Sequence, residues 1–294
     1  MPNILTLDDG LTCLSVAPDI GGSIANWSVS SSGQPLLRAN DDDALAAGTP
    51  RRLGCYPLAP WSNRIGQGGF DTPDGWLALE PNSANDPLPI HGSAWQQVWD
   101  VVDHTAHEIR LQLDCRIPFA YRAQLRYTLR DGLLSIKLST THLDSRAAWH
   151  GLGLHPYLPR TANTRLHAQA EHVWMCDEKG LPTHLADLPE AWDFSTSREL
   201  PATRLDNGFT EWNGRCVISQ PDLGYELIGQ ATGSEYFLVF CPPDLPFFCF
   251  EPVSHPVNAH HLPDKPGLRL LRQGECVEMG FGLQYRAIDP SMQR

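Results

Sequence analysis

The sequence lacks the features that point to nucleic-acid or membrane partners. Its 294 residues include 34 acidic side chains against 22 Lys and Arg, a formal net charge of −12, so the basic excess that supplies most nucleic-acid affinity is missing. No apolar run approaches the ~20 residues that a membrane span needs. The opening MPNILTLDDG has neither a basic nor a long apolar segment, so we expect no signal peptide. These absences favour a cytoplasmic protein that acts on a neutral small molecule.

Closely spaced cysteines are also missing. The eight cysteines form no CxxC pair, and structural zinc sites and thioredoxin-like redox sites usually need such pairs. Scattered cysteines in a long chain without a signal peptide are typical of reduced thiols in a cytosol. We therefore expect small core residues here, with no disulfide framework and no cysteine nucleophile.

Long helical periodicity is scarce, because 25 Pro and 24 Gly interrupt the chain throughout. Short alternating runs replace it. The clearest covers residues 121–143, where Asp131-Gly132 separates two alternating runs, and Asp-Gly is a strong hairpin signal because both turn positions need positive φ. Residues 109–117 alternate in the same way and are expected to pair with this hairpin.

Further strands are expected at both ends of the chain. Residues 4–16 predict a hairpin around Asp8-Asp9-Gly10, residues 276–288 predict a strand that closes a sheet, and residues 186–192 predict a short helix. Many short strands between turn signals are typical of a large antiparallel β-sandwich. Since no repeat or composition shift marks a boundary, we expect an all-β protein with a single domain over residues 1–294.

Two segments place cationic or imidazole groups among aromatic residues. Residues 57–65 carry Arg64 on a proline-rich apolar stretch; the plainer interpretation is an arginine stem that covers apolar surface. Residues 89–95 place His91 beside a glycine and Trp95, whose indole could stack on the C–H face of a sugar. The alternative is a buried structural histidine with core tryptophans.

A third segment, residues 149–158, contains two histidines five positions apart. Side chains five apart on a strand point to opposite faces, so only one of His150 and His155 should face a site. We select His155, because Pro156 biases it toward extended backbone. The alternative is that both histidines only satisfy their own hydrogen bonds.

The fourth segment, residues 247–253, is a strongly apolar aromatic strand that reaches Glu251. Burying a carboxylate is costly unless it is paired or functional. Desolvation should raise its pKa toward the range that suits a general base at neutral pH. The alternative is a glutamate at a strand end that reaches water.

Taken in this order, the four segments resemble the aldose 1-epimerase (galactose mutarotase) family. The matching motifs are Asn-Arg-Ile at 63–65, His-Gly at 91–92, His-Pro-Tyr at 155–157, Glu-Pro at 251–252 and an Asp-x-x-Phe stretch at 206–209. The resemblance runs over nearly the whole chain. Each motif is weak alone, but five in one order are specific.

The resemblance implies a galactose mutarotase-like supersandwich with its site on one concave sheet, and neither a metal nor an organic cofactor. It implies Glu251 as base and His155 as acid in opening the ring of a free aldose such as galactose or glucose. The residues expected to hold the sugar are Arg64, His91, Asp206, Asn63 and Trp61. We expect a monomer or homodimer whose partner is a small-molecule sugar.

Three other functions compete with anomer exchange. A hexose-6-phosphate 1-epimerase on the same fold could use Arg51 and Arg52 to bind phosphate, although the acidic net charge favours a neutral sugar. A glycoside hydrolase could use Glu251 and Asp206 as its carboxylate pair, but it would leave both histidines idle. A non-catalytic carbohydrate-binding protein has little need for a desolvated glutamate.

Two stretches depart from the family pattern. Residues 254–261 are rich in histidine, and a metal site built from His255, His260 and His261 is an alternative, although their spacing resembles no closed zinc set. Residues 181–205 match no family motif. Both stretches could shape the pocket, so the identity of the sugar stays open.

Overall fold

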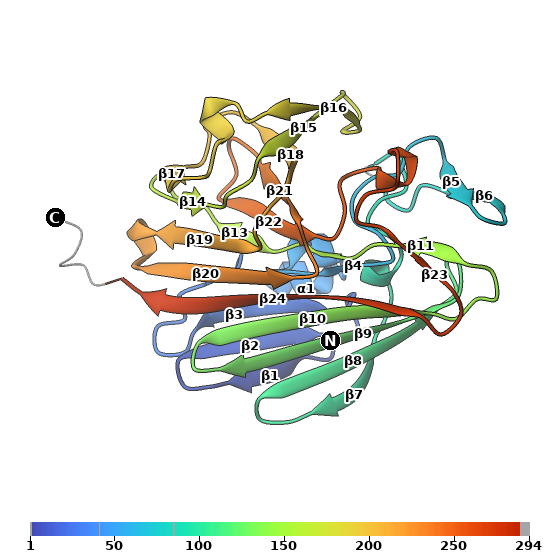
Figure 1. The fold of residues 1–294 in the computed structure, drawn as a ribbon. Coiled ribbons are helices and arrows are strands. Elements are labelled where there is room, and N and C mark those ends of the chain that lie inside the picture. Colours follow the sequence, from blue (N-terminus) through green and yellow to red (C-terminus); the bar gives the residue numbers. More distant parts are fainter. Residues whose placement is uncertain (1, 41, 85, 289–294) are drawn as a thin grey trace.

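Two large antiparallel sheets form the body of the computed structural model, which describes residues 2–40, 42–84 and 86–288 (Figure 1). The first has nine strands. In sheet order these are β17 (Arg198–Glu199), β14 (Arg165–His167), β19 (Arg215–Gln220), β20 (Tyr225–Thr232), β24 (Cys276–Ala287), β10 (Leu133–His142), β9 (Tyr121–Arg130), β8 (Glu108–Cys115) and β7 (Asp100–His104).

The second sheet has eight strands and carries the candidate site. Its order is β16 (Pro182–Asp187), β15 (His172–Cys176), β18 (Leu205–Thr210), β21 (Tyr236–Cys241), β22 (Phe247–Val253), β12 (Gly153–Leu154) and β4 (Pro57–Leu58), while β13 (Tyr157–Pro159) also pairs with β22.

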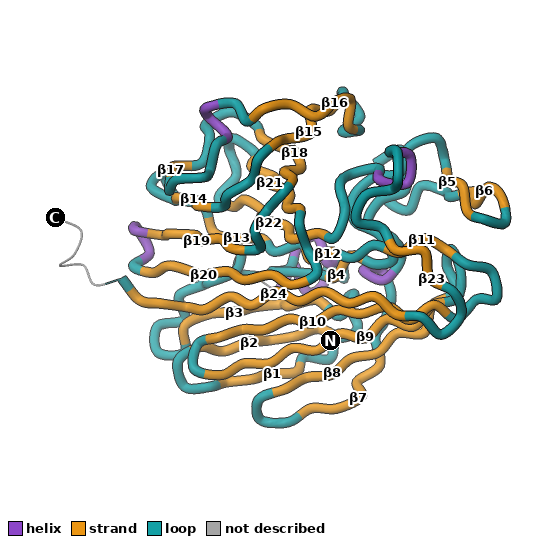
Figure 2. Tube along the Cα trace, viewed as in Figure 1, coloured by secondary structure: helices purple, strands orange, loops and turns teal. Residues whose placement is uncertain are grey.

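Smaller sheets and short helical turns complete the structure (Figure 2). The smaller sheets comprise β1 (Leu5–Asp8), β2 (Thr12–Ala17) and β3 (Ser23–Val29), β5 (Gly69–Thr72) with β6 (Gly75–Ala78), and β11 (Ala148–His150) with β23 (Arg269–Leu271). The helical segments are α1 (Asp42–Ala46) and the 3-10 turns Pro50–Arg52, Ala94–Gln96, Glu190–Trp192, Pro221–Leu223 and Ala259–His261. Within the described ranges, no helix is long and apolar enough to cross a bilayer.

The predicted hairpins are confirmed. β9 and β10 pair around Asp131 and Gly132, whose φ angles of +51° and +73° are the positive values that a two-residue hairpin turn needs. β8 pairs with β9, and β1 pairs with β2, as the alternating runs predict. The strand predicted over residues 276–288 forms as β24, and it lies inside the nine-stranded sheet between β10 and β20.

The predicted helix over residues 186–192 is wrong. Residues up to Asp187 belong to β16, which pairs with β15, and only Glu190–Trp192 form a 3-10 turn. Pro189 restricts the preceding residue to extended backbone, and the ladder with β15 supplies hydrogen bonds that an isolated helical turn could not match.

The side chains of β22 alternate between the core and the candidate site. Phe248 and Phe250 are fully buried in the main core, and the Phe250 ring lies 6.4 Å from that of Phe281 in β24. Because successive side chains point to opposite faces, Cys249 and Glu251 lie on the face turned away from the nine-stranded sheet. The same aromatic strand therefore packs the core and presents a carboxyl group.

Candidate active site

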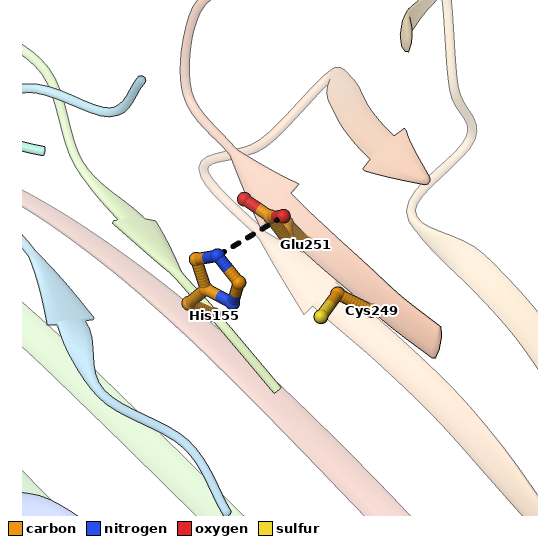
Figure 3. Close-up of side chains that lie close together, drawn as sticks. All are labelled: His155, Cys249 and Glu251. Carbon is orange, nitrogen blue, oxygen red and sulfur yellow. Dashed lines mark ion pairs between the residues drawn. The ribbon is translucent and has the colours of Figure 1, made fainter. Parts of the chain in front are cut away.

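Two ionisable side chains meet across neighbouring strands of the eight-stranded sheet. β13 pairs with β22 so that Tyr157 lies opposite Cys249, and β12 continues in the same register. His155 lies between β12 and β13, midway between Gly153 and Tyr157, and the shared register places it opposite Glu251. The Nε2 atom of His155 lies 3.4 Å from Oε1 of Glu251 (Figure 3). Residues directly opposite in an antiparallel ladder are close enough for their side chains to interact.

Both groups are buried and only half satisfied. His155 is 7% exposed and Glu251 is 3% exposed. Among the described residues, neither Nδ1 of His155 nor Oε2 of Glu251 has a hydrogen-bond partner. Buried polar atoms nearly always have partners, so these two atoms mark a place where polar groups of a ligand belong.

The pair lines a small cavity of about 190 Å³. This volume is below the roughly 300–1,000 Å³ of pockets for drug-sized ligands, and it suits one small ring. Arg64, His91, Asp206 and Asn63 line the same cavity. The structure thus brings together six of the seven side chains that the sequence nominates.

His91 has a fixed tautomer. It has a φ of +63°, and its Nδ1 accepts a hydrogen bond from the backbone N–H of Asn63 at 3.0 Å. Burial lowers the pKa of His91 well below its usual value, and the charges of His155, Arg51 and Arg64 lower it further. A neutral ring with Nδ1 as acceptor carries its proton on Nε2, so His91 has one N–H to donate.

Two ion pairs border the cavity. The Nε of Arg64 lies 2.7 Å from Asp86, and Nη2 of Arg204 lies 2.9 Å from Asp206. All four residues line the cavity. Each carboxylate holds its guanidinium in place, which leaves the remaining N–H groups and carboxylate lone pairs for a hydroxylated ligand.

Burial dominates the electrostatics of the central pair. It lowers the pKa of His155 to about 3, and the positive charges of Arg51 and Arg38 add to this effect. Burial raises the pKa of Glu251 well above its usual value; the negative charge of Asp206 adds to the rise, while Arg64 opposes it. Both directions favour the uncharged forms. Over a wide pH range the pair therefore holds one proton more than a neutral imidazole beside a carboxylate would, and burial favours its location on Glu251.

Comparison with known proteins decides the family. Residues 3–283 match the family model described as aldose 1-epimerase. The chain belongs to the aldose 1-epimerase family. It is 32% identical over 291 residues to the uncharacterized protein YphB of Escherichia coli K12, with 96% of this chain and 98% of that protein covered.

Solved structures agree on the fold. A candidate aldose 1-epimerase from Escherichia coli K12 superposes with a TM-score of 0.92 at 30% identity, covering 98% of this chain and 100% of that chain. A galactose mutarotase-like protein from Clostridium acetobutylicum gives a TM-score of 0.84 at 18% identity, covering 96% and 95%. The predicted all-β, galactose mutarotase-like sandwich is therefore confirmed.

The indoles of Trp61 and Trp95, which the sequence predicts to contact the sugar, lie outside the cavity lining of this aldose 1-epimerase family member. Trp61 is buried in the main core, and Trp95 packs on Tyr56 with ring centroids 5.6 Å apart; both lie outside the cavity lining. A large indole buries more apolar area in a core than on a cavity wall. The aromatic surface of the cavity instead comes from Tyr56, Tyr157 and Phe240.

The tyrosines also support the central histidine. The ring of His155 packs on Tyr56 at 4.6 Å and on Tyr157 at 4.7 Å, and the guanidinium of Arg38 lies 3.7 Å above the Tyr157 ring. Arg51 also lines the cavity. The sequence offered no local signal for Arg38 and Tyr56, because each lies in a segment that reads as ordinary loop or strand.

The histidine-rich loop does not bring His255, His260 and His261 together as a ligand set in the described part of the chain. Nε2 of His255 accepts the backbone N–H of Ser62 at 3.0 Å, and its Nδ1 donates to the carbonyl of Pro256 at 2.8 Å. Nε2 of His261 bonds the carbonyl of Gly69. In the described part of the chain, the nitrogen atoms of this loop do not converge on a common point. His255 and His261 hold backbone, whereas the buried His260 ring packs on Phe70 with ring centroids 4.2 Å apart, and neither of its nitrogens has a hydrogen-bond partner among the described residues.

Two other residue sets among the described residues bring possible metal ligands together: Glu171, His172 and Glu211 at the surface, and a buried set in the candidate site. Ligand atoms of His155, Cys249 and Glu251 lie within 4.8 Å of one another (Figure 3). A zinc ion would need the thiolate form of the cysteine. Burial raises the pKa of the Cys249 thiol well above its usual value, and Glu251 adds to this effect. In the metal-free protein the Cys249 thiol is therefore protonated.

Proposed function

We propose that this family member interconverts the α and β anomers of a free aldose such as galactose or glucose. The observation that carries the proposal is the buried His155–Glu251 pair, whose outer atoms lack partners among the described residues, in a cavity sized for one small ring. Opening a hemiacetal needs a base for the C1 hydroxyl and an acid for the ring oxygen. A buried imidazole beside a carboxyl group supplies both.

The single proton of the pair serves as the catalytic proton. In the free protein, burial favours the form in which Glu251 carries it. Transfer across the 3.4 Å from Oε1 to Nε2 of His155 gives a carboxylate and an imidazolium with the same net charge. A sugar hydroxyl that donates to the carboxylate stabilises this second form. Substrate binding thereby prepares base and acid without proton uptake from solvent.

The reaction then proceeds in two balanced halves. Glu251 takes the proton of the C1 hydroxyl, the C1=O bond forms, the bond from C1 to the ring oxygen breaks, and that oxygen takes the proton of His155. The aldehyde rotates about C1–C2. The ring hydroxyl, returning its proton to His155, attacks the opposite face of C1, and the carbonyl oxygen takes the proton from Glu251. Both residues end as they began.

The remaining cavity residues hold the sugar in this proposal. His91 donates through Nε2, Arg64 donates from its guanidinium, and Asp206 accepts from hydroxyl groups. Asn63 has a supporting part, since its Oδ1 accepts the backbone N–H of Arg64 at 2.8 Å. Orienting the ring over two fixed groups supplies the proximity that an acid–base reaction requires.

The test is the optical rotation of freshly dissolved α-D-galactose and α-D-glucose. We expect faster decay to the unchanged equilibrium rotation, and a loss of about 10²- to 10⁴-fold in rate for Glu251→Gln. The amide has the same shape and no charge to bury, so the variant should fold. Glu199→Gln, at an exposed glutamate, is the matched control.

Three outcomes would contradict the proposal. Near-normal turnover by Glu251→Gln would remove the base from its role. Tight sugar binding without accelerated decay would indicate a carbohydrate-binding protein. Loss of activity in a chelator, restored by zinc, would assign the cluster around Cys249 to a metal.

A further inference from the structure

A third chemically active side chain lies beside the His155–Glu251 pair. Cys249 precedes Glu251 by two residues on β22, so both side chains point to the same face of the sheet. Ligand atoms of His155, Cys249 and Glu251 all lie within 4.8 Å of one another, with the thiol below the His155–Glu251 contact in Figure 3. The proposed proton transfer uses two members of this set and leaves the thiol without a role.

The spacing of these atoms suits a tetrahedral metal ion. Zinc bonds of about 2.1 Å to nitrogen and to oxygen, at a tetrahedral angle, place the two ligand atoms roughly 3.4 Å apart. Nε2 of His155 and Oε1 of Glu251 lie 3.4 Å apart. A zinc–sulfur bond of about 2.3 Å calls for roughly 3.6 Å between sulfur and each other ligand atom. Since no separation in the set exceeds 4.8 Å, the thiol of Cys249 needs to move by no more than about 1.2 Å.

The three donors select zinc among the common divalent ions. Magnesium and calcium prefer oxygen ligands and six or more coordination positions, whereas imidazole, thiolate and carboxylate are the usual ligands of zinc. Three protein ligands leave a fourth position for water. The inner cavity, which His155 and Glu251 line, provides the space for it. Oε2 of Glu251, which is buried and has no hydrogen-bond partner among the described residues, can accept a hydrogen bond from that water.

The charges of the site balance when zinc binds. In the metal-free protein the Cys249 thiol and the Glu251 carboxyl group are both protonated, because burial raises the pKa of each. Zinc joins a thiolate and a carboxylate while two protons leave to solvent, so the net charge of the buried site does not change. Among the described residues, Arg51 is the one cavity arginine without a carboxylate partner. Its charge should keep the affinity below that of a structural zinc site.

We propose that His155, Cys249 and Glu251 form an inhibitory zinc site. Zinc bound there occupies Nε2 of His155 and Oε1 of Glu251, the atoms that exchange protons with the sugar in the proposed reaction, so metal and sugar exclude each other. The binding of zinc stands on the three side chains, whereas its inhibition rests on the proposed anomer exchange. The role is opposite to that of a catalytic metal, because removing the ion raises the rate.

Binding is measured with cobalt(II), which takes the place of zinc in tetrahedral sites and absorbs in the near ultraviolet when a thiolate binds it. Titration of the full chain should give this band at one ion per chain, and zinc should remove it. Cys249→Ala should lack the band, whereas Cys276→Ser, at an exposed cysteine, is the matched control and should keep it. Glu251→Gln keeps the thiol and should weaken cobalt binding at least about tenfold, since even residues behind the ligands contribute that much at metal sites.

Inhibition is measured by polarimetry of α-D-glucose in a buffer that does not bind metals. Zinc at ten times its dissociation constant should raise KM about elevenfold and leave kcat unchanged, and EDTA should restore the rate. Each variant is compared with its own zinc-free rate. His172→Gln removes the imidazole from the surface set Glu171, His172 and Glu211, and should leave this inhibition unchanged.

The outcomes separate the zinc site from the proposed function. A native chain without the cobalt band, or a band of equal strength in Cys249→Ala, would overturn the site. Inhibition that persists in Cys249→Ala with a native circular dichroism spectrum, inhibition that disappears in His172→Gln, or acceleration by zinc would also overturn it. A native chain that shows the band and accelerates no sugar would overturn the proposed function and leave the zinc site standing.

Discussion

Buried histidines should make the folded protein sensitive to mild acid. Burial lowers the pKa of His150 and His155 to about 3, and that of His255 to about 4. Each ring stays neutral in the fold, but in the unfolded chain it takes up a proton below pH ~6.5. The stability that these rings contribute is therefore fully present above pH ~6.5 and is lost as the pH falls toward the folded values.

The size of the effect follows from proton linkage. Between about pH 7 and pH 5, each of the three histidines lowers the free energy of unfolding by about 2 kcal/mol. Glu251 acts in the opposite direction, because burial raises its pKa and the fold retains its proton; one proton can offset at most about 2.7 kcal/mol over these two pH units. The three histidines together lose about 6 kcal/mol, so the net loss is at least about 3 kcal/mol. Burial also lowers the pKa values of His91 and His260, which increases the loss. This is a large share of the 5–15 kcal/mol typical of a folded domain.

Urea unfolding followed by tryptophan fluorescence at both pH values measures this loss. His150 bonds Thr140 and lies outside the cavity, so His150→Gln can be compared without touching the sugar site. Because an amide cannot be charged, this variant should lose about 2 kcal/mol less than the native chain on acidification. The exposed His107 gives the control His107→Gln. Equal stability of the native chain at both pH values would refute the reasoning.

Two further substitutions test the cavity and its support. Asp86→Asn should release the Arg64 guanidinium, which lies 2.7 Å from Asp86, and should raise KM for a monosaccharide about tenfold with little change in kcat. Initial rates measured by polarimetry check this. An unchanged KM would show that the ion pair does not contribute to sugar binding. Gly92→Ala places a Cβ 2.1 Å from the carbonyl oxygen of Ala59 at a φ of +65°, and should cost more than about 2 kcal/mol in urea unfolding. Gly10→Ala meets no atom within 4 Å and should cost only about 1 kcal/mol; equal losses would contradict the steric argument.

The sequence predicted what local chemistry controls. Turn residues and alternation were enough for the hairpins, since Asp131-Gly132 determines the β9–β10 register by itself. The order of strands in the large sheets depends on packing between distant segments, and no local pattern encodes it. The single domain and the cytoplasmic location stay predictions.

The same division holds for the site. Glu251, His155 and His91 were predictable because each is a polar group in a setting where burial is costly. Asp86 was not predictable, because no local sequence pattern distinguishes a solvated loop aspartate from one that pairs with an arginine distant in the sequence. Trp61 was predicted to contact the sugar but lies in the main core. An indole suits either place, so the sequence alone does not distinguish them.

The position of β24 has a consequence for biosynthesis. It follows the other described strands in the chain, yet it pairs with β10 on one side and β20 on the other. Until the ribosome has released residues up to Ala287, β10 and β20 of the nascent chain each present an unpaired edge that can recruit other chains. The nine-stranded sheet can therefore close only after translation has passed this strand, and a product that stops before Cys276 should aggregate.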